Sequence, residues 1–158
     1  MLGDHLYVSD LEAACARQLV EEFERAGRSV VGLATAPVDE ARHFGCVAGA
    51  WEAEGRLAIS EFAEKPDRDY ARAHLRVEGL GEDRVLTLFG QYALTPRIFE
   101  LLGENIVCGA RERGEFQLTS CLDRLRQEEG FIGVLVRGRR FDIGAPQAFR
   151  SALAAFGG

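Results

Sequence analysis

Short apolar segments alternate with amphipathic segments along this 158-residue chain, and this alternation limits the possible folds more than any other feature. The run 29–34 is nearly all apolar, which is typical of a strand covered on both faces. The segment 10–26 repeats apolar residues at helical spacing and precedes Gly27, a favoured helix C-cap. Predicted strands cover 29–34, 44–51, 56–63, 85–94 and 131–136, and predicted helices cover 10–26, 70–75, 97–102, 115–129 and 147–156. This order favours an α/β fold whose sheet has a parallel core and an antiparallel extension.

The segments between these elements are predicted to be loops or turns. Residues 37–42 and 105–114 are expected to be loops, and 139–144 a turn. Glu52-Ala53-Glu54-Gly55 separates two strand-like runs, so that we expect a β-hairpin there. Thr95-Pro96 is expected to start the helix at residue 97.

Length and charge narrow the class of protein. With 158 residues, 47% of them hydrophobic, the chain is long enough for one core, and we expect a single domain over 1–158. A net charge of −6 and a pI near 5.2 argue against nucleic-acid binding, which usually needs a basic surface. No apolar run approaches the ~20 residues of a membrane span, and the first residues lack a signal-peptide pattern. The expected location is cytoplasmic, without a membrane partner.

The four cysteines are Cys15, Cys46, Cys108 and Cys121. They form no Cys-x-x-Cys pair and have no histidine at ligand spacing. We expect buried, reduced thiols, because free cysteine packs as a small hydrophobic residue. A zinc site is not expected.

Lys65 is the single lysine among 19 basic residues, and it stands between Glu64 and Pro66 after an apolar run. A lysine ammonium is a compact charge on a flexible stem, whereas a guanidinium is a wide planar fork. The two are not interchangeable at a tight phosphate or sugar site. Strand ends are also where α/β folds place ligand-binding residues. Glu64-Lys65 therefore predicts a binding position, with an ordinary surface lysine as the alternative.

Two carboxylates stand beside glycines. Asp4 follows Gly3, at what we expect to be the end of a strand, and Asp142 precedes Ile143-Gly144. Such a pair suits Mg²⁺, which is typically held by one or two carboxylates together with substrate phosphates. Ordinary Asp-Gly turn chemistry is the alternative. His5 is either a structural, hydrogen-bonded histidine or a base beside Asp4.

Glycine also interrupts two predicted strands, at Gly45 and Gly90. Glycine inside a strand often marks a place where a ligand approaches the backbone closely. The chain contains no Gly-x-Ser-x-Gly, Walker or Gly-x-Gly-x-x-Gly motif that would identify another chemistry. These two glycines are therefore further candidate site positions.

Six segments, taken in chain order, carry a family resemblance. They are Leu2-Gly3-Asp4-His5, Phe44-Gly45-Cys46-Val47, Phe62-Ala63-Glu64-Lys65-Pro66, Gly90-Gln91-Tyr92-Ala93-Leu94-Thr95-Pro96, Gly114-Glu115-Phe116-Gln117-Leu118-Thr119 and Phe141-Asp142-Ile143-Gly144. The series resembles the sugar-1-phosphate nucleotidyltransferases, most closely the bacterial UTP–glucose-1-phosphate uridylyltransferases. The resemblance covers nearly the whole chain but only about the last half to two-thirds of a family member. It implies a partial Rossmann-like, glycosyltransferase-A-like α/β domain, a three-layer sandwich with a mixed sheet.

The resemblance also implies roles for single residues. Asp4 and Asp142 would hold the catalytic Mg²⁺ against the phosphates. Lys65 would contact the sugar phosphate and Glu64 the sugar hydroxyls. The reaction would be an in-line attack of glucose 1-phosphate on the α-phosphate of UTP, which gives UDP-glucose and pyrophosphate. Such a transfer is catalysed by positioning and charge neutralisation, without a protein nucleophile.

Three further site positions follow from the resemblance. The backbone at Gly45 and Gly90 would pass close to the hexose, and Glu115 would lie at the sugar site. Gln91 stands where the family usually has arginine, and Ser120 where it usually has aspartate. Fine substrate contacts are therefore expected to differ.

The family's Gly-x-Gly-Thr-Arg loop, which binds the nucleoside triphosphate, does not occur in these 158 residues. We therefore expect an N-terminally truncated domain that supplies the sugar-phosphate and metal half of the site. An unpaired strand edge and an apolar surface that includes Val30, Val31 and Leu33 would then be exposed, which predicts a homo-oligomer or a separate N-terminal segment. Thymidylyl or guanylyl transfer and a non-catalytic sugar-phosphate-binding fragment are the alternatives.

Overall fold

The structure is a computed structural model that describes residues 3–111, 114, 116–144 and 146–156. Its main sheet is a ring of strands in the order β2, β5, β3, β4, β6, in which β6 pairs again with β2. These strands span Val30–Pro37, Arg84–Ala93, Gly45–Ala53, Arg56–Glu64 and Ile132–Leu135 respectively. No helix among the described residues is long and apolar enough to cross a membrane.

The closed ring corrects the expected three-layer sandwich and the expected parallel core, whereas the expected mixed sheet is confirmed. The fold is mixed α/β, but β2 and β6 form the one parallel pair in the ring, and its other pairs are antiparallel. Irregular register in the β2–β5 and β3–β4 ladders marks bulges, which bend strands and increase their twist. The bent strands let β4 reach β6 and close the barrel. The hairpin expected around residues 52–55 is confirmed as β3–β4.

The principal core includes Val31, Leu33, Leu57, Leu86 and Phe131, together with buried residues of the helices that pack against the ring of strands. The expectation of an exposed apolar surface at Val30, Val31 and Leu33 is wrong, because all three side chains are fully buried. Strand β2 pairs with β5 on one side and with β6 on the other, so that neither of its edges is free.

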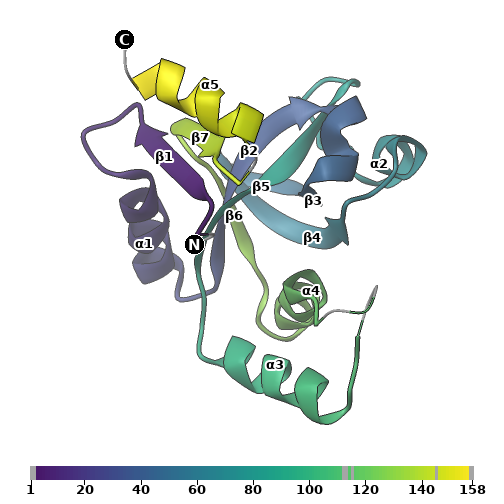
Figure 1. The fold of residues 1–158 in the computed structure, drawn as a ribbon. Coiled ribbons are helices and arrows are strands. Elements are labelled where there is room, and N and C mark those ends of the chain that lie inside the picture. Colours follow the sequence, from purple (N-terminus) through teal and green to yellow (C-terminus); the bar gives the residue numbers. More distant parts are fainter. Residues whose placement is uncertain (1–2, 112–113, 115, 145, 157–158) are drawn as a thin grey trace.

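Strands β1 (His5–Ser9) and β7 (Gly138–Asp142) form a separate antiparallel ribbon beside the barrel (Figure 1). The expected turn at 139–144 is therefore wrong over most of its length, and β1 lacked a sequence prediction. Within the described part of the chain, β1 and β7 pair only with each other. The ribbon thus retains the free strand edges that the barrel lacks.

The helices lie outside the barrel. They are α1 (Cys15–Ala26), the 3₁₀ helix η1 (Val38–His43), α2 (Arg68–His74), α3 (Arg97–Val107), α4 (Leu118–Glu129) and α5 (Pro146–Phe156). The segment 37–42, expected to be a loop, is thus mainly the 3₁₀ helix. Gly27 ends α1 with a φ of 63°, and its N–H donates to the carbonyl of Phe23, so that the expected C-cap is confirmed.

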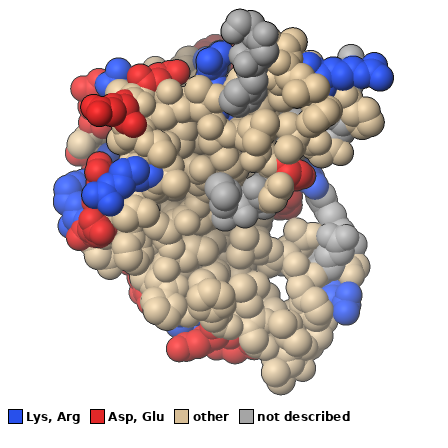
Figure 2. Space-filling model, turned by 60° about the vertical axis from the view of Figure 1, so that its left-hand side comes forward, with Lys and Arg blue, Asp and Glu red and all other residues tan. Residues whose placement is uncertain are grey.

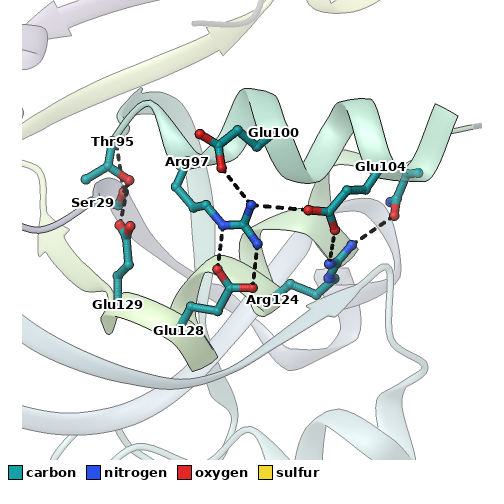
Figure 3. A network of polar contacts seen from close by, with 9 residues as sticks. Ser29, Thr95, Arg97, Glu100, Glu104, Arg124, Glu128 and Glu129 are labelled. Carbon is teal, nitrogen blue, oxygen red and sulfur yellow. Dashed lines mark hydrogen bonds and ion pairs between the residues drawn. The ribbon is translucent and has the colours of Figure 1, made fainter. Parts of the chain in front are cut away.

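Helices α3 and α4 lie together at one end of the molecule, and an ion-pair network joins them (Figure 3). Arg97 contacts Glu128, Glu100 and Glu104, and Arg124 contacts Glu104. The bond from Arg124 lowers the pKa of Glu104, and the bond from Arg97 lowers the pKa of Glu128. Single exposed ion pairs contribute little, but a network that shares charges orients the two helices.

The cysteines follow the sequence expectation in part. Cys15, Cys46 and Cys121 are buried and reduced, whereas Cys108 is exposed, contrary to prediction. Cys108 caps the C-terminal end of α3, outside the packed face of that helix. Burial raises the pKa of Cys46 to about 12, so that its thiol is inert at neutral pH.

Figure 2 shows one face of the molecule, on which charged residues lie mainly around an uncharged centre.

A first prediction concerns the β3–β4 bulge. A Cβ at Gly49 would lie 2.2 Å from the carbonyl oxygen of Ala58, a backbone atom that a rotamer change cannot move. We expect Gly49→Ala to destabilise the protein by about 1–3 kcal/mol, as overpacking does. Urea unfolding measures the difference.

Gly103 in α3 supplies the matched control, because a Cβ there meets nothing within 4 Å. Gly103→Ala should stabilise the protein by about 0.4–1 kcal/mol through the lost flexibility of the unfolded chain. Equal unfolding midpoints for the two variants would contradict the assigned packing of the bulge.

Candidate functional site

A cavity of about 370 Å³ opens where the ribbon meets the barrel. Residues of both units line it. Among them are five of the site residues that the family resemblance implied, Asp4, Gly45, Glu64, Lys65 and Gly90, and also His5. Asp4 directly precedes β1, Gly45 begins β3, and Gly90 lies within β5. Glu64 ends β4, and Lys65 follows it. The fold thus brings together positions that are far apart in the chain.

Lys65 has the one positive φ, 48°, among the described residues other than glycine. This left-handed conformation costs a non-glycine residue roughly 1–2 kcal/mol. It is held by a hydrogen bond from the Lys65 N–H to the Phe44 carbonyl at 3.1 Å. The Nζ atom lies 3.8 Å from Glu64 Oε1, and the side chain is about half exposed. Retained backbone strain at a cavity wall favours a functional role over an ordinary surface lysine.

Glu64 is held in place by helix α4. Thr119 Oγ1 donates a hydrogen bond of 2.6 Å to Glu64 Oε2. Gly45 lies directly against the same carboxylate: a Cβ there would be 3.3 Å from Glu64 Oε2 and 2.6 Å from Leu88 Cδ1. A side chain at position 45 would therefore require the Leu88 and Glu64 side chains to move. The absence of a side chain there keeps this wall of the cavity thin.

Gly90 interrupts β5 with a φ of 89°, as a residue with a side chain would rarely do. Its carbonyl accepts a hydrogen bond of 3.1 Å from the hydroxyl of Tyr7 on the ribbon. The neighbouring Tyr92 also lines the cavity. Burial, and to a lesser extent the charge of Glu64, raise the pKa of Tyr92 to about 12, so that it is neutral at ordinary pH.

The backbone brings Asp4 close to Asp142. His5 lies opposite Asp142 in the ribbon, and the Ile143 N–H donates to the Asp4 carbonyl at 2.8 Å. Asp4 lies immediately before β1. Its exposed carboxylate lies 2.8 Å from His5 Nδ1. The side chain of Asp142 and the whole of Glu115 lie outside the described residues.

In the described part of the chain, which leaves out the side chain of Asp142, no group of three or more His, Cys, Asp or Glu side chains is placed to hold an ion. Mg²⁺ needs only one or two carboxylates and completes its shell with water and substrate oxygens. The exposed carboxylate of Asp4, and the closeness of the Asp4 and Asp142 backbones, are consistent with such a site. The metal role of these two residues stays a prediction.

Sequence reasoning missed several residues of the cavity wall or its support, among them Tyr7, Thr119 as the partner of Glu64, and Arg140. Arg140 comes from β7, donates to the Leu88 carbonyl and lies over the Phe44 ring at 4.6 Å. The only signal for Arg140 in the sequence was its place beside Phe141-Asp142, in a segment that was predicted to be a turn.

The chain belongs to the nucleotidyl transferase family, whose sequence model matches residues 1–156. It is 29% identical over 149 residues to UTP–glucose-1-phosphate uridylyltransferase 2 of Staphylococcus saprophyticus, and the aligned region covers 94% of this chain and 46% of the relative. It is 32% identical over 147 residues to the UTP–glucose-1-phosphate uridylyltransferase of Streptococcus pneumoniae, which covers 91% of this chain and 44% of the relative.

Solved structures agree with this assignment. A UDP-glucose pyrophosphorylase complexed with UDP-glucose superposes with a TM-score of 0.82 at 25% identity, over 99% of this chain and 54% of that one. The apo form of a UDP-glucose pyrophosphorylase also gives 0.82, over 99% and 52%. The chain therefore spans about half the length of the relatives it matches.

Proposed function

We propose that this chain supplies the sugar-phosphate and metal half of an enzyme that transfers uridylyl from UTP to glucose 1-phosphate. The products would be UDP-glucose and pyrophosphate. The observation that carries the proposal is that Asp4, Gly45, Glu64, Lys65 and Gly90 all line the same cavity. Similarity to relatives named for this reaction supports the choice of uridylyl transfer.

The chemistry requires two negatively charged phosphates to approach each other. An oxygen of glucose 1-phosphate attacks the α-phosphorus of UTP, the bond to the bridging oxygen breaks, and pyrophosphate leaves with that electron pair. Bound Mg²⁺ would neutralise charge on the phosphates. The residues of this chain orient the sugar phosphate and complete its charge balance, which is the larger part of catalysis in such transfers.

Each cavity residue has a role that fits its surroundings. Lys65 would offer its ammonium, a mobile donor on a fixed backbone, to the sugar phosphate. Glu64 would accept hydrogen bonds from sugar hydroxyls, with its rotamer held by Thr119. The thin wall at Gly45 and the bulged strand at Gly90 would admit the hexose close to the backbone. Asp4 and Asp142 would hold Mg²⁺ through carboxylate oxygens.

Separate calorimetric titrations of the chain with glucose 1-phosphate and with UTP, each with and without Mg²⁺, test the proposal. Glucose 1-phosphate should bind, and more tightly with Mg²⁺. Glucose serves as the control for the phosphate and should bind far more weakly. Failure of glucose 1-phosphate to bind under both conditions would contradict the proposal.

Turnover assays then separate the alternatives. Pyrophosphate release is measured with glucose 1-phosphate and UTP, dTTP or GTP in turn. We expect no UDP-glucose from the chain alone, because the family's Gly-x-Gly-Thr-Arg segment does not occur in its sequence. Addition of a polypeptide that carries that segment should restore release with UTP. Preference for dTTP or GTP would favour thymidylyl or guanylyl transfer. The oligomeric state of the chain is a separate question, and sedimentation would detect the expected homo-oligomer.

A further inference from the structure

The candidate site is divided between two structural units. The ribbon carries Asp4 and Asp142, whereas the barrel carries Glu64 and Lys65. The ribbon strands pair with each other and not with the barrel within the described residues. A ligand that spans both units therefore depends on contacts that hold the ribbon on the barrel in one position.

Two residues that are register partners in the ribbon make such contacts. Tyr7 lies opposite Arg140 in the β1–β7 pair. The Tyr7 hydroxyl donates to the Gly90 carbonyl at 3.1 Å, and Arg140 Nη1 donates to the Leu88 carbonyl at 2.5 Å. The Tyr7 ring also packs on Phe89, with ring centroids 5.3 Å apart. Together they hold a single short stretch of β5.

That stretch is where β5 departs from regular pairing. The β2–β5 register passes from Val31 opposite Tyr92 to Leu33 opposite Leu88, so that residues 89–91 form a bulge on β5. Backbone polar groups displaced from a ladder need other partners. Tyr7 donates to a carbonyl within the bulge and Arg140 to one at its edge, so the ribbon is fixed to the barrel at the strand irregularity that forms the cavity wall.

A second path of contacts leads from Arg140 to the lysine. The guanidinium lies 4.6 Å from the centre of the Phe44 ring, and the Phe44 carbonyl accepts the N–H of Lys65 at 3.1 Å. Arg140 thus precedes Asp142 by two residues along β7. It is also connected to Lys65 through Phe44, which contacts both residues. Burial raises the pKa of Tyr7, which keeps its hydroxyl a neutral donor.

We propose that Tyr7 and Arg140 are positioning residues that set the spacing between the metal carboxylates on the ribbon and the sugar-phosphate residues on the barrel. This inference rests on the proposed function for what the two halves of the cavity bind. It adds that the two halves are energetically coupled through this cross-strand pair.

Coupling is measured by calorimetry of glucose 1-phosphate with and without Mg²⁺. In the wild type we expect Mg²⁺ to tighten binding by about tenfold or more, within the usual range for coupled sites. Tyr7→Phe removes the hydroxyl, and Arg140→Lys keeps the charge but loses the fork that contacts both Leu88 and Phe44. In each variant the tightening should fall below about threefold, while metal-free affinity changes little. A purely structural role would lower both affinities together.

Matched controls come from the same residue types. Arg139→Lys alters the adjacent guanidinium, which lies over Phe141 of its own strand. Tyr70→Phe removes a hydroxyl that donates to Glu61, away from the ribbon. Both controls should keep the full tightening by Mg²⁺. Full tightening in Tyr7→Phe and Arg140→Lys as well would overturn the inference.

A ligand-free measurement separates this inference from the proposed function. Spin labels at Asp10→Cys, beside the ribbon, and Glu54→Cys, on the barrel, report their distance distribution in a Cys108→Ser background. The distribution should be narrow with Tyr7 and Arg140 present and broad in the double variant. If the wild type binds no glucose 1-phosphate, the proposed function fails. A broad distribution would then still support the positioning pair, and an unchanged one would overturn it.

Discussion

Replacement of Lys65 by arginine should weaken binding of glucose 1-phosphate by about 10- to 150-fold, nearly as much as replacement by alanine. This range is the loss of one charged hydrogen bond, roughly 1.5–3 kcal/mol. The backbone at position 65 has a φ of 48°. Lysine, arginine and alanine all lack glycine's freedom there, so the comparison isolates the side-chain head group. Calorimetry with glucose 1-phosphate measures the effect.

The control for the lysine is its near neighbour Arg68, which pairs with Asp39 at 2.7 Å on the surface. Arg68→Lys makes the reverse exchange of cations and should leave glucose 1-phosphate binding unchanged. If wild type and Lys65→Arg bind equally, Lys65 is an ordinary surface lysine and the assignment of the phosphate subsite is wrong.

A second large effect is expected at Asp4. Asp4→Asn removes a negative charge but keeps an oxygen that can accept a hydrogen bond from His5. Metal-free binding of glucose 1-phosphate should stay the same or tighten, because repulsion of the phosphate is reduced. The tightening by Mg²⁺ should disappear, at a cost of about tenfold or more in affinity at saturating metal. Titration with Mn²⁺ followed by its paramagnetic resonance gives an independent measure of ion binding.

Asp10→Asn is the control, since Asp10 is an exposed carboxylate just beyond the other end of β1. It makes the same change of charge and should leave the Mg²⁺ effect intact. Loss of the effect in both variants would indicate general electrostatics, and its retention in Asp4→Asn would remove Asp4 from the metal site.

The features that the sequence predicted depend on local rules. The hairpin of β3 and β4 follows from two strand-like runs around a glycine-containing turn, and Gly27 ends α1 because it can adopt a positive φ. Glu64-Lys65 could be singled out because Pro66 ends the strand. These rules act over a few residues, and they were sufficient to name five residues of the cavity wall.

The features that sequence reasoning missed are pairings between distant segments. Nothing near residues 138–142 indicates that β1 will lie beside them, and their arginines look like a solvated turn. The closure of the barrel was missed for the same reason, since the apolar run 29–34 is equally consistent with a parallel sheet core. Arg140 and Tyr7 become meaningful only when their strands are paired.

The closed ring has a consequence for the order in which the protein folds. Strand β2 is completed by β6, where Val30 lies opposite Ile132, and the ribbon joins His5 to the strand that ends at Asp142. The β3–β4 hairpin needs only a short turn and can form within microseconds. The ring and the ribbon must wait for long loops to close, which is entropically slow. We therefore expect the β3–β4 hairpin, with Lys65 at its end, to form before the ribbon that carries Asp4 and Asp142, so that a refolding chain should regain its native hairpin before it can bind ligand.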